Sequence, residues 1–133
     1  MKKIPLTLLF LALSTLAPAA DPVTLFDGAN LDPWTMDKPG AWIAKDGLLQ
    51  PAEGGGGGYV WTKEKYENFT LTLDFKMSEK CNSGVFIRTD PKNPVQGGFE
   101  IQVMDSAATP KPGKHDCGAL YDALAPSENA AKP

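Results

Sequence analysis

Apolar and polar residues alternate most strictly over residues 69–77, which read Phe-Thr-Leu-Thr-Leu-Asp-Phe-Lys-Met. Successive side chains of a strand point to opposite faces, so this period of two predicts a half-buried antiparallel strand. Shorter apolar runs at residues 23–26, 84–88 and 99–104 predict three more strands.

A hairpin is predicted around Asp46-Gly47, which separates the apolar runs 41–45 and 48–50. Both turn residues tolerate positive φ, so Asp-Gly between two apolar runs favours a two-residue turn. Trp42 is the best candidate for an inward-facing residue of this hairpin. Because helical periodicity is almost absent after residue 20, we predict an all-β fold, an antiparallel β-sandwich or jelly roll.

The first 20 residues have the pattern of a cleavable secretory signal peptide. Lys2 and Lys3 precede an apolar run over residues 4–16, and small residues follow at Ala17-Pro18-Ala19-Ala20. A helix needs about 20 apolar residues to span a bilayer, and this run is shorter. Its length therefore argues against a membrane anchor. We therefore expect a secreted or periplasmic protein without membrane attachment, whose mature domain covers residues 21–133.

Charge and cysteine content limit the partners and the kinds of site that the protein can have. The net charge is -3, and the clustered Lys and Arg of a nucleic-acid surface are absent, so no nucleic-acid partner is expected. Cys81 and Cys117 would be exported together, which permits a disulfide without establishing it. Neither cysteine has a partner at metal-site spacing. No cofactor is predicted, although the sequence leaves a bound metal ion open.

Polar side chains gather on one face of the last two predicted strands. If the apolar residues face the core and the strands are neighbours, Arg88, Glu100 and Gln102 share the outer surface with Phe86 and Met104. Such a face can hold a sugar, because rings cover its C–H face while amides and charges bond its hydroxyls. The same residues could equally form an ordinary cross-strand ion pair on a solvated face.

Three loop residues leave similar alternatives. Asp105 follows one of these strands and Asn82 begins the other, but loop Asp and Asn are more often turn formers than ligands. His115, the only histidine, could be a solvated loop residue, or an acid or base, since histidine titrates near neutrality. A G-x-S-x-G motif and the Glu-x-Asp-x-x-Glu pattern of laminarinase-type sandwich enzymes are both absent.

Five segments of the chain follow a recognisable order. They are Leu25-Phe26-Asp27-Gly28 with Trp34, Trp42 with Asp46-Gly47-Leu48-Leu49, Asn82-Ser83-Gly84-Val85-Phe86-Ile87-Arg88, Gly98-Phe99-Glu100-Ile101-Gln102-Val103-Met104-Asp105, and Gly118-Ala119-Leu120-Tyr121. Together they resemble the 3-keto-disaccharide hydrolase domain family, from residue 23 to about residue 133. That family's domain continues with several more strands, so the resemblance implies a concanavalin-like jelly roll that is incomplete at the C-terminus.

The resemblance also implies an exported bacterial enzyme that acts on glycosides oxidised to a ketone at carbon 3. A base would remove the proton at C2, the C1 leaving group would depart by elimination, and water would then add. Glu100 or Asp105 would be the base, and Arg88 would stabilise the enolate oxygen. The substrate-binding candidates are Gln102, Asn82, His115 and Tyr121. A non-catalytic sugar-binding module, or a structural module of a larger assembly, are the alternatives.

The signal peptide gives the first prediction. Because the A-x-A site ends near residue 20, the mature protein should begin close to Ala20 or Asp21. N-terminal sequencing of exported protein checks this, and a mature chain that begins at Met1 would contradict it.

Overall fold

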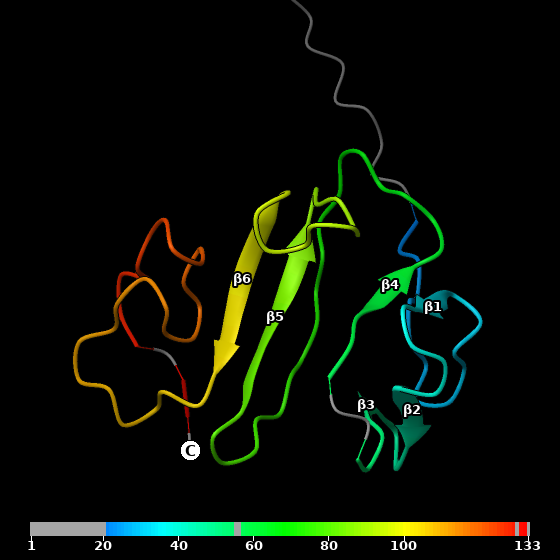
Figure 1. Cartoon of the computed structure of the whole chain (residues 1–133), viewed down its shortest axis with the longest axis horizontal. Coiled ribbons are helices and arrows are strands. Elements are labelled where there is room, and N and C mark those ends of the chain that lie inside the picture. The colour runs from blue at the N-terminus through cyan, green and yellow to red at the C-terminus, as the bar shows by residue number, and fades with distance from the viewer. Residues whose placement is uncertain (1–20, 55–56, 130, 133) are drawn as a thin grey trace, which may run out of the picture. The chain divides into compact units, whose positions relative to one another are not determined.

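The computed structural model describes residues 21–54, 57–129 and 131–132; the predicted signal peptide lies outside these residues. In the described residues the regular structure is all strand, without a helix, and every strand pairing is antiparallel, which confirms the predicted all-β class (Figure 1). Within the same residues, no helix is available to span a membrane. The strands are β1 (Trp34–Met36), β2 (Trp42–Lys45), β3 (Leu48–Pro51), β4 (Val60–Thr62), β5 (Asn82–Ile87) and β6 (Phe99–Met104).

Contacts divide the chain into two units, Met1–Phe69 and Thr70–Pro133. In the first unit β1 pairs with β4, and β2 pairs with β3. The β2–β3 hairpin is the predicted one: Lys45 lies opposite Leu48, and Asp46 and Gly47 form the turn. Their φ angles are 54° and 76°. A two-residue turn of this kind requires a positive φ at both positions.

Two of the three tryptophans of this unit, Trp34 and Trp42, are held through their indole nitrogens. Trp42 is half-buried rather than fully enclosed, and its Nε1 donates to the Gly58 carbonyl oxygen at 3.1 Å. Trp34 Nε1 donates to the Leu25 carbonyl oxygen at 2.7 Å. The predicted strand at residues 23–26 is wrong: this stretch has no strand pairing and is tied to the unit through Trp34 instead.

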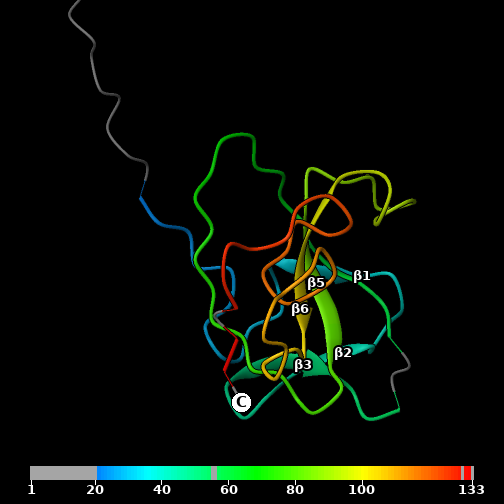
Figure 2. The same ribbon diagram turned by 90° about the vertical axis from the view of Figure 1, so that its left-hand side faces the viewer.

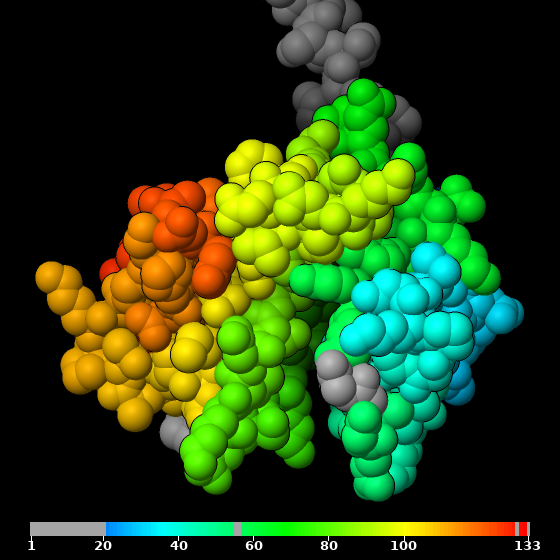
Figure 3. Space-filling view, in the orientation of Figure 1, coloured from blue at the N-terminus to red at the C-terminus, as the bar shows by residue number. Residues whose placement is uncertain are grey.

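The second unit is built around β6. On one edge β6 pairs with β5, in a register that runs from Asn82 opposite Met104 to Ile87 opposite Phe99. On its other edge it pairs with residues 118–121, where Leu120 lies opposite Ile101. Figures 1 and 2 show this sheet from the front and nearly edge-on, and in Figure 3 the orange and red C-terminal residues pack against the yellow ones.

The long alternating stretch does not form the predicted strand. Residues 69–77 carry no strand pairing, and Leu71, Leu73 and Phe75 are 42%, 45% and 53% exposed. Alternation makes a segment suitable for a sheet, but a strand forms only where a neighbour satisfies its backbone groups. No described residue does so for residues 70–76.

The two cysteines are both free thiols, so the bridge that the sequence permitted does not form here. Cys117 is buried, and its Sγ lies 4.0 Å from Met77 Sδ. Cys81 is half-buried where the chain enters β5.

The hairpin turn supplies the second prediction. Gly47→Ala should lower the free energy of unfolding by about 1 kcal/mol, because a Cβ disfavours a φ of 76°. Gly113→Ala is the control, since its added Cβ meets only Asp116 Oδ2, at 3.6 Å, and its φ is not among the positive ones. Equal midpoints of chemical denaturation for the two variants would contradict the assignment.

Candidate functional site

The candidate site lies at one end of the three-stranded ladder in the second unit. The β5–β6 register places Phe86 opposite Glu100. On the other edge Tyr121 N donates to the Glu100 carbonyl oxygen at 2.9 Å, which brings Tyr121 into the same row. Neighbours across antiparallel strands have Cβ atoms about 4.5–5.5 Å apart. Glu100 therefore lies between two aromatic residues in one row of the sheet.

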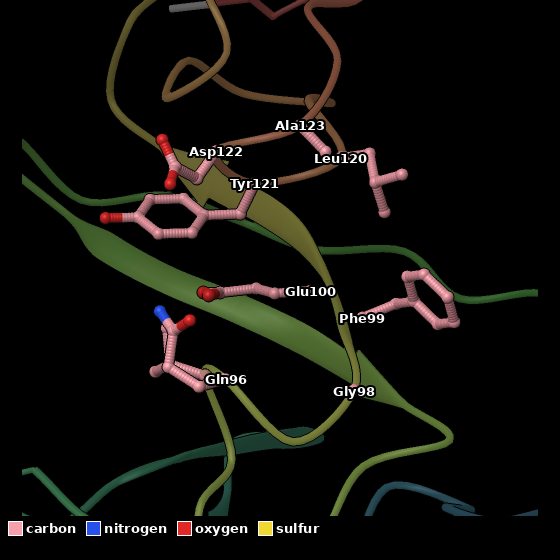
Figure 4. A pocket seen from close by; sticks show the side chains of 9 residues that line it. Gln96, Gly98, Phe99, Glu100, Leu120, Tyr121, Asp122 and Ala123 are labelled. Carbon is pink, nitrogen blue, oxygen red and sulfur yellow. The ribbon is translucent and has the colours of Figure 1, made fainter.

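A pocket of about 240 Å³ opens beside this carboxylate. Figure 4 shows Gln96, Glu100 and Tyr121 directed to one side, while Phe99 and Leu120 point the opposite way. Typical ligand pockets measure roughly 300–1,000 Å³, so this one suits a single small ring better than a long chain. Its lining residues are Val95, Gln96, Gly98, Phe99, Glu100, Leu120, Tyr121, Asp122 and Ala123.

Glu100 is held across the neighbouring strand, over a glycine. A Cβ at Gly84 would overlap Glu100 Oε1 and would come within 2.7 Å of Cγ and Cδ. With its amide nitrogen facing Glu100, the Gln102 side chain donates to Glu100 Oε1 at 3.2 Å and to the Ser83 carbonyl oxygen at 2.9 Å. Burial raises the pKa of the Glu100 carboxyl above its ordinary value.

The exposure of β6 differs from the prediction. Val103 is buried as expected, but Phe99 and Ile101 are 50% and 37% exposed. Gln102, predicted to face outward, is only 3% exposed. An amide can be buried at little cost when its hydrogen bonds are made, and period two alone does not say which face is covered.

Gln102 is thus enclosed, and its side-chain amide contacts Glu100 and Asn82. Asn82 is exposed at the opposite end of the ladder, and with the Gln102 amide nitrogen facing Glu100 its Oδ1 lies 3.2 Å from the Gln102 side-chain oxygen. Small neighbours make room for the buried amide, because Gly84 lies opposite Gln102 on β5 and Ala119, fully buried, accepts from Gln102 N at 2.9 Å.

Arg88 follows directly after β5, at the same end of the ladder as Glu100. It is exposed and has a φ of 51°, so the strand alternation that predicted its direction ends one residue earlier. Glycine is needed beside it: a Cβ at Gly98 would overlap Thr89 and come within 2.6 Å of the Arg88 carbonyl oxygen.

Asp105 lies at the other end of β6 from Glu100. Five residues of strand separate them, roughly 16 Å. Its Oδ2 accepts a hydrogen bond from Lys80 N at 2.9 Å, while Asp105 N donates to the Cys81 carbonyl oxygen at 3.0 Å. The structure thus gives Asp105 a turn-stabilising position and does not bring it together with Glu100.

His115 lies near Tyr121, as part of a charged loop. The two rings are 5.0 Å apart, tilted by 42°, and His115 Nε2 lies 3.1 Å from Asp122 Oδ1. Lys114 Nζ is 2.6 Å from the same oxygen. Sequence reasoning missed Asp122 and Lys114, because residues 109–124 have no periodicity that would bring the two charges together.

The described residues contain no group of three or more His, Cys, Asp or Glu side chains arranged to hold a metal ion. Chemically, the pocket offers a carboxylate of raised pKa beside an aromatic ring. Such a group can accept a proton near neutrality more readily than an ordinary carboxylate.

The raised pKa of Glu100 gives the third prediction. At a pH above the raised pKa, Glu100 is charged in the folded protein, and burying that charge destabilises the fold. At a pH below 4.5, the ordinary pKa, Glu100 is protonated in both the folded and the unfolded state, so this cost disappears. Glu100→Gln should therefore be more stable than the parent at neutral pH, and the gain should shrink as the pH falls towards 4.5. Denaturant unfolding across this range measures it, with the exposed Glu128→Gln as control. A gain that is independent of pH would contradict the assignment.

Comparison with known proteins agrees with the resemblance drawn from the motifs. The chain is similar to a 3-keto-disaccharide hydrolase of Bacteroides thetaiotaomicron, with 27% identity over 139 residues, which covers 84% of this chain and 48% of the relative. It thus spans about half the length of the curated relative that it matches. No solved structure matches it significantly. Because residues 21–133 match the family's pattern, the chain belongs to the 3-keto-alpha-glucoside-1,2-lyase-like domain family.

Proposed function

We propose that the pocket beside Glu100 cleaves glycosides whose sugar carries a ketone at carbon 3. The observation that carries this proposal is a carboxylate with a raised pKa, fixed across Gly84 in an open pocket. Membership of the family and the similarity to a hydrolase named for 3-keto-disaccharides favour this substrate class.

The chemistry requires a single base. A ketone at C3 acidifies the hydrogen on C2, and Glu100 accepts that proton while the electron pair passes to the ketone oxygen as an enolate. The enolate then reforms the ketone, a C1–C2 double bond forms, and the C1–O bond breaks. The departing oxygen takes a proton, and water can afterwards add at C1. Two opposed carboxylates, as in an oxocarbenium mechanism, are not needed.

The other residues at this end of the ladder would bind and orient the substrate. Phe86 and Tyr121 flank Glu100 and offer rings for the C–H face of a sugar. Gln96 projects to the same side of the pocket and can bond a hydroxyl. Arg88 would supply the positive charge that stabilises the enolate oxygen.

Export belongs to the same proposal. We propose that residues 1–20 direct secretion or passage into the periplasm. The net charge of -3 and the lack of basic clustering agree with a neutral carbohydrate as the partner.

The fourth prediction concerns turnover of a chromogenic 3-keto-glucoside. Glu100→Gln should lower kcat by about 10²–10⁴, the usual contribution of a positioned proton acceptor. Gly84→Ala should also lower kcat, because the new Cβ displaces the Glu100 side chain while the strand backbone accepts alanine. Ser83→Ala is the matched control: it changes the next residue, whose side chain points to the opposite face.

Release of the aglycone reports turnover, and calorimetry with the same compound reports binding. Binding without turnover by the parent protein would favour a sugar-binding module instead. Parent-like kcat in both Glu100→Gln and Gly84→Ala would place the base elsewhere.

A further inference from the structure

The loop before Tyr121 closes on itself through Asp122. Asp122 N donates to the Lys114 carbonyl oxygen at 3.0 Å, and Lys114 Nζ donates to the Asp122 carbonyl oxygen at 3.2 Å. The same ammonium group lies 2.6 Å from Asp122 Oδ1. Both residues are more than half exposed. Ion pairs this open to solvent contribute at most about 1 kcal/mol, so stability alone is a weak reason for the arrangement.

His115 uses the carboxylate oxygen that Lys114 also contacts. Its Nε2 lies 3.1 Å from Asp122 Oδ1. Hydrogen bonds from Lys114, and then from His115, hold the pKa of the Asp122 carboxyl below its ordinary value, so at neutral pH the group only accepts. In this contact Nε2 therefore donates to the carboxylate, which orients the imidazole towards Asp122.

The fixed imidazole lies against a wall of the pocket. The centres of the His115 and Tyr121 rings are 5.0 Å apart. Tyr121 is tied to β6 through its backbone and stands beside Glu100 in Figure 4. Contacts thus run from Asp122 to His115, from His115 to Tyr121, and from Tyr121 to the pocket.

We propose that Asp122 is a positioning residue: it holds the His115 ring against Tyr121 and so fixes Tyr121 as the sugar-contacting wall beside Glu100. The consequence for catalysis rests on the function proposed above, whereas the arrangement of the two rings does not. Asp122 also borders the pocket, so the ring signals, which report its contact with His115, are the readout that tests the positioning role.

Asp122→Gly is the informative variant. Because Asp122 has a φ of 58°, glycine accepts this backbone conformation and removes the side chain with its carboxylate. Lys114→Met is the matched control, since it removes the ion pair but leaves the contact between Asp122 and His115. A chain with a single histidine makes the nuclear magnetic resonance signals of the His115 ring unambiguous.

We expect nuclear Overhauser effects between the His115 and Tyr121 rings in the parent and in Lys114→Met, and their loss in Asp122→Gly. With the 3-keto-glucoside, Asp122→Gly should raise KM about 2–10-fold, the affinity contribution of one aromatic contact, with kcat nearly unchanged. Lys114→Met should keep the parent KM.

The outcomes separate the two proposals. A parent protein without turnover contradicts the proposed function, and the ring signals then decide the positioning role alone. Ring signals that persist in Asp122→Gly overturn the positioning role. Lost ring signals with a parent-like KM would show that the Tyr121 wall needs no support, which also overturns it.

Discussion

Backbone pairing on both edges of β6 is the constraint on which the candidate site depends. β5 alone would leave Glu100 on an edge strand with one aromatic neighbour, Phe86. The return of the chain through residues 118–121 supplies the second edge and brings Tyr121 alongside. The Tyr121 side of the pocket and the His115 contact follow from this second pairing, whereas β5 supplies Gly84 and Phe86.

The two polar residues of β6 differ in exposure, although alternation places both on one face. Gln102 is enclosed, and its amide is satisfied by neighbouring groups, so its burial costs little. Glu100 remains at the pocket, and its partial burial disfavours the charge without removing access. An enclosed amide beside an accessible carboxylate is a sound arrangement for a base, because the amide bonds one carboxylate oxygen and so orients the group.

Local chemistry made part of this predictable. The Asp46-Gly47 turn follows from what two adjacent residues tolerate, and the alternation over residues 99–104 gave the strand and its two faces. The burial of Gln102 was not predictable, since it depends on residues 118–121 pairing beside it, and that stretch has no periodicity. The strand predicted over residues 69–77 was wrong for a related reason. Their alternation suits a sheet, but a strand also needs a neighbouring strand, which the local sequence does not specify. Asp122 was missed because its role depends on contacts with Lys114 and His115, and only the folding of the loop brings these residues together.

The close approach of Glu100 to Gly84 has a consequence for how this surface can vary. The two positions, 16 residues apart in the chain, share one volume, so the choice of residue at one restricts the choice at the other. A side chain at position 84 is compatible with a shorter or absent acid at position 100, but not with this glutamate in this place. Anyone who redesigns the face for another sugar must therefore treat the glycine and the acid as a single unit and exchange them together.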